Sequence, residues 1–139
     1  MTFRREDHQQ LERLLGDFLR ESGALCGIVL DRGGYCLVSQ GLTHGIDLTS
    51  MAALAAGAYA STKELAKLIG ETEFSVLFQQ GTKDHLLVSL IDAAHLMLVV
   101  FDDHTPAGLV HSCAKEHVTR LAAVLEGARQ RRLSPEPPV

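Results

Sequence analysis

The chain has 139 residues and a net charge of −4, with 46% hydrophobic and 22% charged residues. These values are typical of one globular domain with a usable core, and the mixture of acidic and basic residues argues against a nucleic-acid-binding surface. No run reaches the roughly 20 apolar residues that cross a membrane, so we expect neither a nucleic-acid partner nor a membrane. The polar stretch Met1–Gln10 and three cysteines without framework spacing predict a cytoplasmic protein with reduced thiols.

The first predicted element is an amphipathic helix. Its core-facing stripe recurs at helical spacing and consists of Leu11, Leu14, Leu15, Phe18 and Leu19. Asp7 and Gln10 are expected to cap its start, and Gly23 is expected to end it in the left-handed conformation.

Five strands are predicted, as a pair and a later group of three. The pair is Ala24–Leu30 and Tyr35–Gln40, and the glycines between the two runs predict a hairpin. The later runs are Glu73–Gln80, His85–Asp92 and His95–Asp102. The last of them is apolar on both faces, as expected of a central strand covered on each side.

The second predicted helix contains an uncharged run, Leu48–Thr62, with the sequence LTSMAALAAGAYAST. Asp47 is a suitable N-cap and Gly70 a suitable stop. The larger side chains are expected on one broad arc: Leu48, Met51, Leu54, Tyr59, Leu65 and Ile69. Small residues are expected on the opposite side: Ala52, Ala53, Ala56, Gly57 and Ala60. A helix usually buries one stripe and exposes the other, so this pattern predicts packing on both sides, with a second chain as one of the packed bodies.

The third predicted helix is opened by Thr105 as the cap and Pro106 at the first helical position. Its apolar stripe is Val110, Cys113, Ala114, His117, Val118, Leu121 and Leu125. A proline-rich tail, 133–139, is expected to be disordered after a single domain over 1–132. The element order is therefore α-β-β-α-β-β-β-α, an α+β fold in which helices cover an antiparallel sheet.

Residues that could carry chemistry are few, and no catalytic, metal-binding or cofactor-binding residue is predicted. Cys113 and His117 share a helix face, but their apolar surroundings explain both as core residues, and no set of four zinc ligands is apparent. Cys26 and Cys36 lie on neighbouring predicted strands and are interpreted as small buried side chains. No Gly-x-Ser-x-Gly elbow or phosphate-binding loop occurs. This inventory favours binding over catalysis.

Three segments, in this order, resemble the Roadblock/dynein-light-chain family. They are GIVLDRGGYCLVSQG (Gly27–Gly41), KELAKLIG (Lys63–Gly70) and HLLVSLIDAAHLMLVVFDDHTPAGLVHSCAKE (His85–Glu116). Asp31, Gly34, Gly108 and Leu109 stand at the places that match the family pattern. The resemblance extends from about Asp7 to Ala128 and implies a profilin-like fold, a five-stranded antiparallel sheet with helices on both faces.

The resemblance also implies a function. Roadblock domains are commonly non-enzymatic docking modules, and many serve small Ras-like GTPases. The chain is similar to a stand-alone bacterial type of member, whose dimer stimulates GTP hydrolysis by repositioning the GTPase's own residues and does not insert an arginine. Family dimers pair their second helices and join their third strands into one sheet. Carried onto this chain, that interface comprises Met51, Leu54, Ala55, Ala58, Tyr59, Ser61, Thr62 and Leu65. The strand Phe74–Gln79 runs along the seam and contributes Phe74, Val76 and Phe78.

The leading hypothesis is thus a non-catalytic homodimeric regulator or scaffold of a small Ras-like GTPase, with a possible activating role. Two alternatives stay open: an interaction module outside GTPase signalling, and a small-molecule sensor, because profilin-like sheets can enclose ligands. The sequence leaves open the identity of the partner, whether the dimer includes a paralogue, and which arc of the second helix faces the partner.

Overall fold

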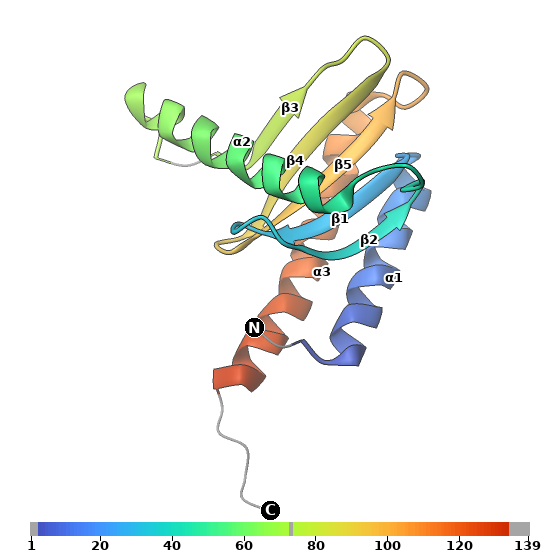
Figure 1. Ribbon diagram of the computed structural model, residues 1–139, viewed down its shortest axis with the longest axis vertical. Helices are drawn as coiled ribbons and strands as arrows, with labels where there is room; N and C mark the ends of the chain where they lie inside the picture. Colours follow the sequence, from blue (N-terminus) through green and yellow to red (C-terminus); the bar gives the residue numbers. More distant parts are fainter. Residues whose placement is uncertain (1–2, 73, 134–139) are drawn as a thin grey trace, which may run out of the picture.

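The computed structural model describes residues 3–72 and 74–133, and within them the predicted helices and strands occur in the predicted order (Figure 1). The elements are α1 (Arg5–Ser22), β1 (Cys26–Asp31), β2 (Cys36–Gly41), α2 (Leu48–Leu68), β3 (Val76–Gln79), β4 (Asp84–Asp92), β5 (His95–Asp102) and α3 (Ala107–Leu133). The α+β class and the α-β-β-α-β-β-β-α order are confirmed.

All five strands form one antiparallel sheet in the order β2-β1-β5-β4-β3. Helices cover both faces: α2 crosses one face, and α1 and α3 lie side by side on the other (Figure 1). β3 is an edge strand with four residues, Val76–Gln79, and its pairing partner in the described chain is β4. One long side of β3 is therefore open.

The two faces of the sheet support two separate cores. Alternation along β5 sends Met97, Val99 and Phe101 toward α1 and α3, and Leu96 and Leu98 toward α2. All five side chains are at most 2% exposed. The prediction of a central strand covered on each side is confirmed.

The expected cap of the first helix is wrong by one turn. α1 begins at Arg5, so Arg4 is the N-cap, and its backbone N–H donates to Asp7 Oδ2 at 3.0 Å. Asp7 also forms an ion pair with Arg131 near the end of α3. Burial alone would raise the pKa of Asp7, but the hydrogen bonds from Arg131 and Arg4 outweigh burial and hold that pKa below its ordinary value. Gly23, with φ 78°, ends the helix as predicted.

Both ends of the third helix differ from the prediction by one residue. α3 begins at Ala107, after Pro106, and the Thr105 hydroxyl donates to the Gly23 carbonyl oxygen at 3.1 Å. Thr105 therefore joins α3 to the end of α1 and does not act as the predicted cap. Leu133 is the last helical residue, and the remainder of the predicted tail, 134–139, lies outside the described residues.

The bounds of four strands also differ from the prediction. β2 spans Cys36–Gly41 and β4 begins at Asp84. β3 begins at Val76 and not at the predicted Glu73, which lies outside the described residues. β1 begins at Cys26 and reaches Asp31. In the described ranges, no helix is both long and apolar enough to cross a membrane.

Candidate protein interface

The side of α2 that faces the sheet carries small residues. The larger aliphatic side chains of the helix are exposed to solvent. The buried residues of the helix are Ala52, Ala55, Ala56 and Tyr59. Leu54 and Leu65 are 73% and 63% exposed, and Leu68 and Ile69 are also exposed. Two sequence expectations are corrected: Tyr59 belongs to the sheet-facing side and not to the arc of Leu54, and Ala53, Gly57 and Ala60 are exposed. In the single chain, one side of α2 is therefore exposed to solvent.

Small residues are needed on α2 because the backbone of the β1–β2 turn approaches the helix closely. Gly34, in the β1–β2 turn, has φ 96°, and a Cβ there would lie 3.0 Å from Ala53 Cα. A side chain at Gly34 would therefore move the turn away from the helix. Asp47 caps the start of α2 as predicted, because its Oδ1 accepts the Ser50 backbone N–H at 3.1 Å.

An apolar groove of about 380 Å³ separates α2 from the β3–β4 side of the sheet. Its lining consists of Met51, Leu54, Ala55, Ala58, Leu77, Gln79, Leu86, Val88 and Leu98. Gln79 is the one residue of this lining with a polar side chain. α2 packs over β1, β2 and β5, so its own side chains do not close the groove above β3.

Eight of the predicted interface residues are on α2, and the structure places them in different environments. Met51, Leu54, Ala55 and Ala58 line the groove. Ser61 and Leu65 are exposed farther along the helix, and Thr62 is half-buried. Tyr59 is 1% exposed and packs in the core beneath α2.

The predicted strand residues lie apart from the groove. Val76 and Phe78 point to the face covered by α1 and α3, where they line a second hollow of about 200 Å³ with Leu87 and the start of α3. Phe74 precedes β3 and packs on Tyr59, with the ring centroids 4.7 Å apart. The sequence analysis placed Leu77 and Gln79 on the interface strand without naming them as interface residues, and it missed Leu86, Val88 and Leu98 on the groove face. Period-two alternation along β3 was the signal that could have identified Leu77 and Gln79.

Tyr59 joins α2 to the segment before β3 and to the β1–β2 turn. Its hydroxyl donates to the Phe74 carbonyl oxygen at 2.9 Å. The Arg32 guanidinium lies 5.3 Å from the Tyr59 ring centroid and donates to the Ala93 carbonyl oxygen at 3.0 Å. Tyr59 thus fixes the position of α2 at one end of the groove.

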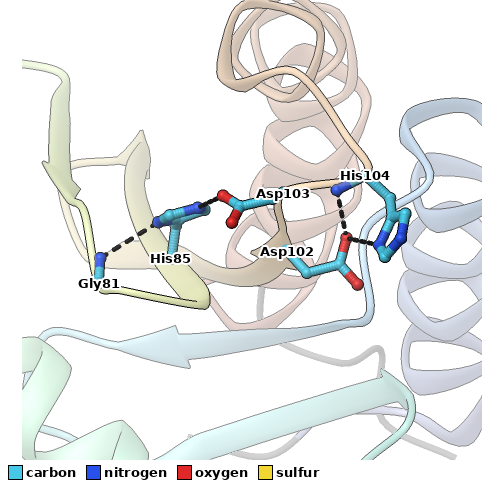
Figure 2. Close-up of polar contacts among 5 residues, drawn as sticks. All are labelled: Gly81, His85, Asp102, Asp103 and His104. Carbon is cyan, nitrogen blue, oxygen red and sulfur yellow. Dashed lines mark hydrogen bonds and ion pairs between the residues drawn. The ribbon is translucent and has the colours of Figure 1, made fainter.

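His85, on β4, is buried and lies between Gly81 and Asp103 (Figure 2). Its Nδ1 accepts the Gly81 backbone N–H at 3.1 Å, and its Nε2 lies 2.6 Å from Asp103 Oδ1. Because Nδ1 is an acceptor, the neutral ring carries its proton on Nε2 and donates to the Asp103 carboxylate. Nδ1 thus binds the β3–β4 turn and Nε2 binds the turn after β5, so His85 has a structural role.

Three of the remaining candidates for chemistry, His117, Cys26 and Cys113, are part of the core. His117 is fully buried, and its Nδ1 donates to the Cys113 carbonyl oxygen at 2.9 Å, which confirms it as a core residue. Burial raises the pKa of the Cys26 and Cys113 thiols, which keeps them protonated. Cys36 is exposed, so its interpretation as a buried side chain is wrong. Among the described residues, no three His, Cys, Asp or Glu side chains are grouped so that they could hold a metal ion.

The fold, with its open helix arc and open edge strand, is that of a Roadblock/LC7 domain. The Roadblock/LC7 family model matches residues 10–101, and the chain belongs to this family. Among solved structures, Myxococcus xanthus MglB is 31% identical, with 92% of this chain and 96% of that chain covered and a TM-score of 0.85. A structure described as MglB with tetrameric arrangement is 30% identical over 92% of this chain and 96% of that chain, with a TM-score of 0.87.

The chain is thus similar to MglB over nearly its full length. Acanthamoeba castellanii profilin II is 10% identical over 81% of this chain and 97% of that chain, with a TM-score of 0.59, which confirms the profilin-like fold alone. The search of curated proteins returned no match.

Proposed function

We propose that this chain is a non-catalytic, homodimeric regulator of a small Ras-like GTPase and that it acts in the cytoplasm. The observation that carries the proposal is the apolar groove of about 380 Å³ between α2 and the β3–β4 side of the sheet, beside an open strand edge. The chain resembles MglB over 92% of its length, and Roadblock domains commonly serve Ras-like GTPases.

The proposed dimer pairs α2 with α2 of a second copy and β3 with β3. This arrangement would bury Leu54, which is 73% exposed in one chain. Full burial of one leucine contributes about 1.5–3 kcal/mol. Joining the two β3 edges would also pair the backbone N–H and C=O groups of the open edge. An unpaired edge can otherwise bind other chains and lead to aggregation. The interface would be isologous, because both copies present the same surface.

The proposal assigns no catalytic residue, metal or cofactor to this chain. The support is that both nitrogens of His85 are engaged and that burial raises the pKa of the thiols of Cys26 and Cys113. No arginine is nominated for insertion into a GTPase. Activation would then act through residues of the GTPase that the dimer repositions.

The test is single-turnover GTP hydrolysis by a small Ras-like GTPase from the same organism, with and without this protein. We expect binding that depends on the bound nucleotide and a rate increase of about tenfold to a hundredfold, below the ~10³-fold or more that an inserted arginine supplies. Leu54→Glu should abolish both effects, because it places a charge in the proposed interface. Ala60→Glu is the matched control, because Ala60 is exposed and does not line the groove.

The outcomes separate the candidate roles. Nucleotide-dependent binding without a rate change identifies a scaffold. A stable dimer that binds no GTPase in either nucleotide state contradicts GTPase regulation and favours an interaction module outside this signalling.

A further inference from the structure

The β3–β4 turn, residues 80–83, lies beyond the ladder that joins its two strands. The last pair of this ladder is Gln79↔Leu86. Among the described residues, no backbone–backbone hydrogen bond outside the helices and strands involves residues 80–83. The turn is bound by a side chain, because the Gly81 N–H donates to His85 Nδ1 at 3.1 Å (Figure 2). The position of the turn therefore depends on an acceptor that can itself bind a proton.

The other nitrogen of the His85 ring binds a turn that has hydrogen bonds of its own. His85 Nε2 lies 2.6 Å from Asp103 Oδ1, in the turn between β5 and α3. The Asp102 carbonyl oxygen accepts the Thr105 N–H at 3.2 Å, and Asp102 Oδ1 accepts the His104 N–H at 2.9 Å. The hydrogen bond from the His104 N–H holds the pKa of Asp102 below its ordinary value. This turn is therefore closed by bonds that do not involve His85.

The His85 ring is buried between two aromatic side chains. It is 6% exposed, and its ring centroid lies 5.3 Å from that of Phe101 and 6.3 Å from that of Phe78. Of the charged groups around the ring, Asp103 contacts it, and a carboxylate there stabilises a positive charge on the ring. The other charged or titratable residues of the surrounding elements are Lys83 in the β3–β4 turn, Asp84 on β4, Asp102 and His104 near the end of β5, and His111 on α3.

Protonation of the ring changes its two hydrogen bonds in opposite ways. Histidine is the side chain whose charge ordinarily changes between about pH 5 and pH 8. A proton taken from solvent binds His85 Nδ1, because Nε2 of the neutral ring already carries one. The new N–H then faces the Gly81 N–H, donor against donor, so this hydrogen bond breaks. The hydrogen bond from Nε2 to the Asp103 carboxylate becomes charge-assisted and stronger.

We propose that His85 is a pH-sensitive latch on the β3–β4 turn: the neutral ring binds Gly81, and the protonated ring releases it while Asp103 holds the ring in place. Gln79 and Leu86 line the apolar groove and also another hollow of about 410 Å³ at the turn. Release at acidic pH therefore frees the residues at this end of the groove. The latch goes beyond the proposed function and does not depend on it, because its parts all lie within one chain.

NMR spectroscopy of the full-length chain between about pH 8 and pH 5 tests the latch. Long-range proton–nitrogen spectra report the charge of the His85 ring, and amide spectra report the Gly81 N–H. We expect the Gly81 amide proton to shift upfield as it loses its acceptor, with the same midpoint as the His85 ring. Protection of this amide against exchange, relative to an unstructured peptide at the same pH, should fall by about threefold to tenfold, the factor that corresponds to one hydrogen bond.

Three variants assign the response to His85. In His85→Asn, the side-chain oxygen can accept the Gly81 N–H in place of Nδ1, and nothing titrates, so the Gly81 signals should not change with pH. Asp103→Asn keeps an acceptor for Nε2 and removes its charge, so release should need a lower pH. This second variant keeps the latch testable if His85→Asn does not fold. His104→Asn is the matched control, because His104 pairs with Asp102, and the Gly81 response should remain.

Three outcomes would overturn the latch. A Gly81 amide that stays unchanged while His85 becomes charged would show that protonation does not release the turn. A Gly81 response that persists in His85→Asn, or disappears in His104→Asn, would belong to another titrating group. A His85 ring that remains neutral down to about pH 5 would leave the turn bound throughout this range. All of these outcomes are separate from dimerisation and GTPase binding, so they leave the proposed function unaffected.

Discussion

At the scale of single residues, glycine is required where β2 ends. Gly41 has φ +94°, in the left-handed region that L side chains rarely adopt, and a Cβ there would lie 2.4 Å from the Leu25 carbonyl oxygen. The same Cβ would lie 2.8 Å from Cys26 Cα, a backbone atom that cannot move aside as a flexible side chain could. Gly57, in α2, has no heavy atom within 4 Å of an added Cβ. The same substitution should therefore have opposite effects at these two positions.

We predict that Gly41→Ala lowers the free energy of unfolding by about 2–4 kcal/mol, because backbone strain and overpacking add. Gly57→Ala should raise it by about 0.5–1 kcal/mol, because alanine is the better helix former. Urea denaturation of both variants at one protein concentration measures the two effects. A loss below about 1 kcal/mol for Gly41→Ala would mean that the end of β2 relaxes around the new methyl group.

At the scale of elements, α2 is held to the sheet by small residues and by one large side chain, Tyr59. Small residues allow the close approach, and the Tyr59 hydroxyl joins the helix to the Phe74 carbonyl immediately before β3. This hydrogen bond thus joins the helix to the segment that leads into the edge strand.

We predict that Tyr59→Phe lowers the free energy of unfolding by about 1 kcal/mol, because it removes one partly buried hydrogen bond and keeps the ring. The amides of β3 should also exchange with deuterium faster than in the unaltered protein, since the start of the strand loses its anchor. Tyr35→Phe is the control, because Tyr35 is 74% exposed and its loss of a hydroxyl should change neither measurement. Equal exchange in both variants would show that Phe74 does not depend on Tyr59.

The elements also show where local patterns suffice. The Leu11–Leu19 stripe and the apolar run of β5 correctly indicated their buried faces, because helical and strand periodicities act over a few residues. The arc of α2 was assigned incorrectly for Tyr59. α2 has apolar side chains around most of its circumference. The local sequence therefore does not indicate which of these side chains face the sheet.

At the scale of the whole molecule, the proposed dimer links stability to protein concentration. Leu54, Leu65 and the edge of β3 are open in one chain. A protein that binds a second copy only when folded is stabilised by mass action.

We predict that the thermal midpoint rises by about 2–4 °C for each tenfold increase in protein concentration. Leu54→Glu should remove this dependence without unfolding the chain, since Leu54 does not belong to the buried core. Differential scanning calorimetry over a hundredfold concentration range provides the measurement. A midpoint that is independent of concentration in the unaltered protein would argue against the dimer.

The sequence by itself determined the element order, the antiparallel class and the central position of β5, because caps, turns and apolar periodicity are local. It also identified α2 and the third strand as the parts to examine. Only the tertiary structure decided that β1 pairs with β5, because this pairing joins residues far apart in the chain. The family resemblance implied that the third strand is an edge, and the order of the sheet confirms it. The tertiary structure likewise turned Tyr59 inward and brought Leu77 and Leu54 together in one groove. A groove is a property of two packed elements, and neither element encodes it alone.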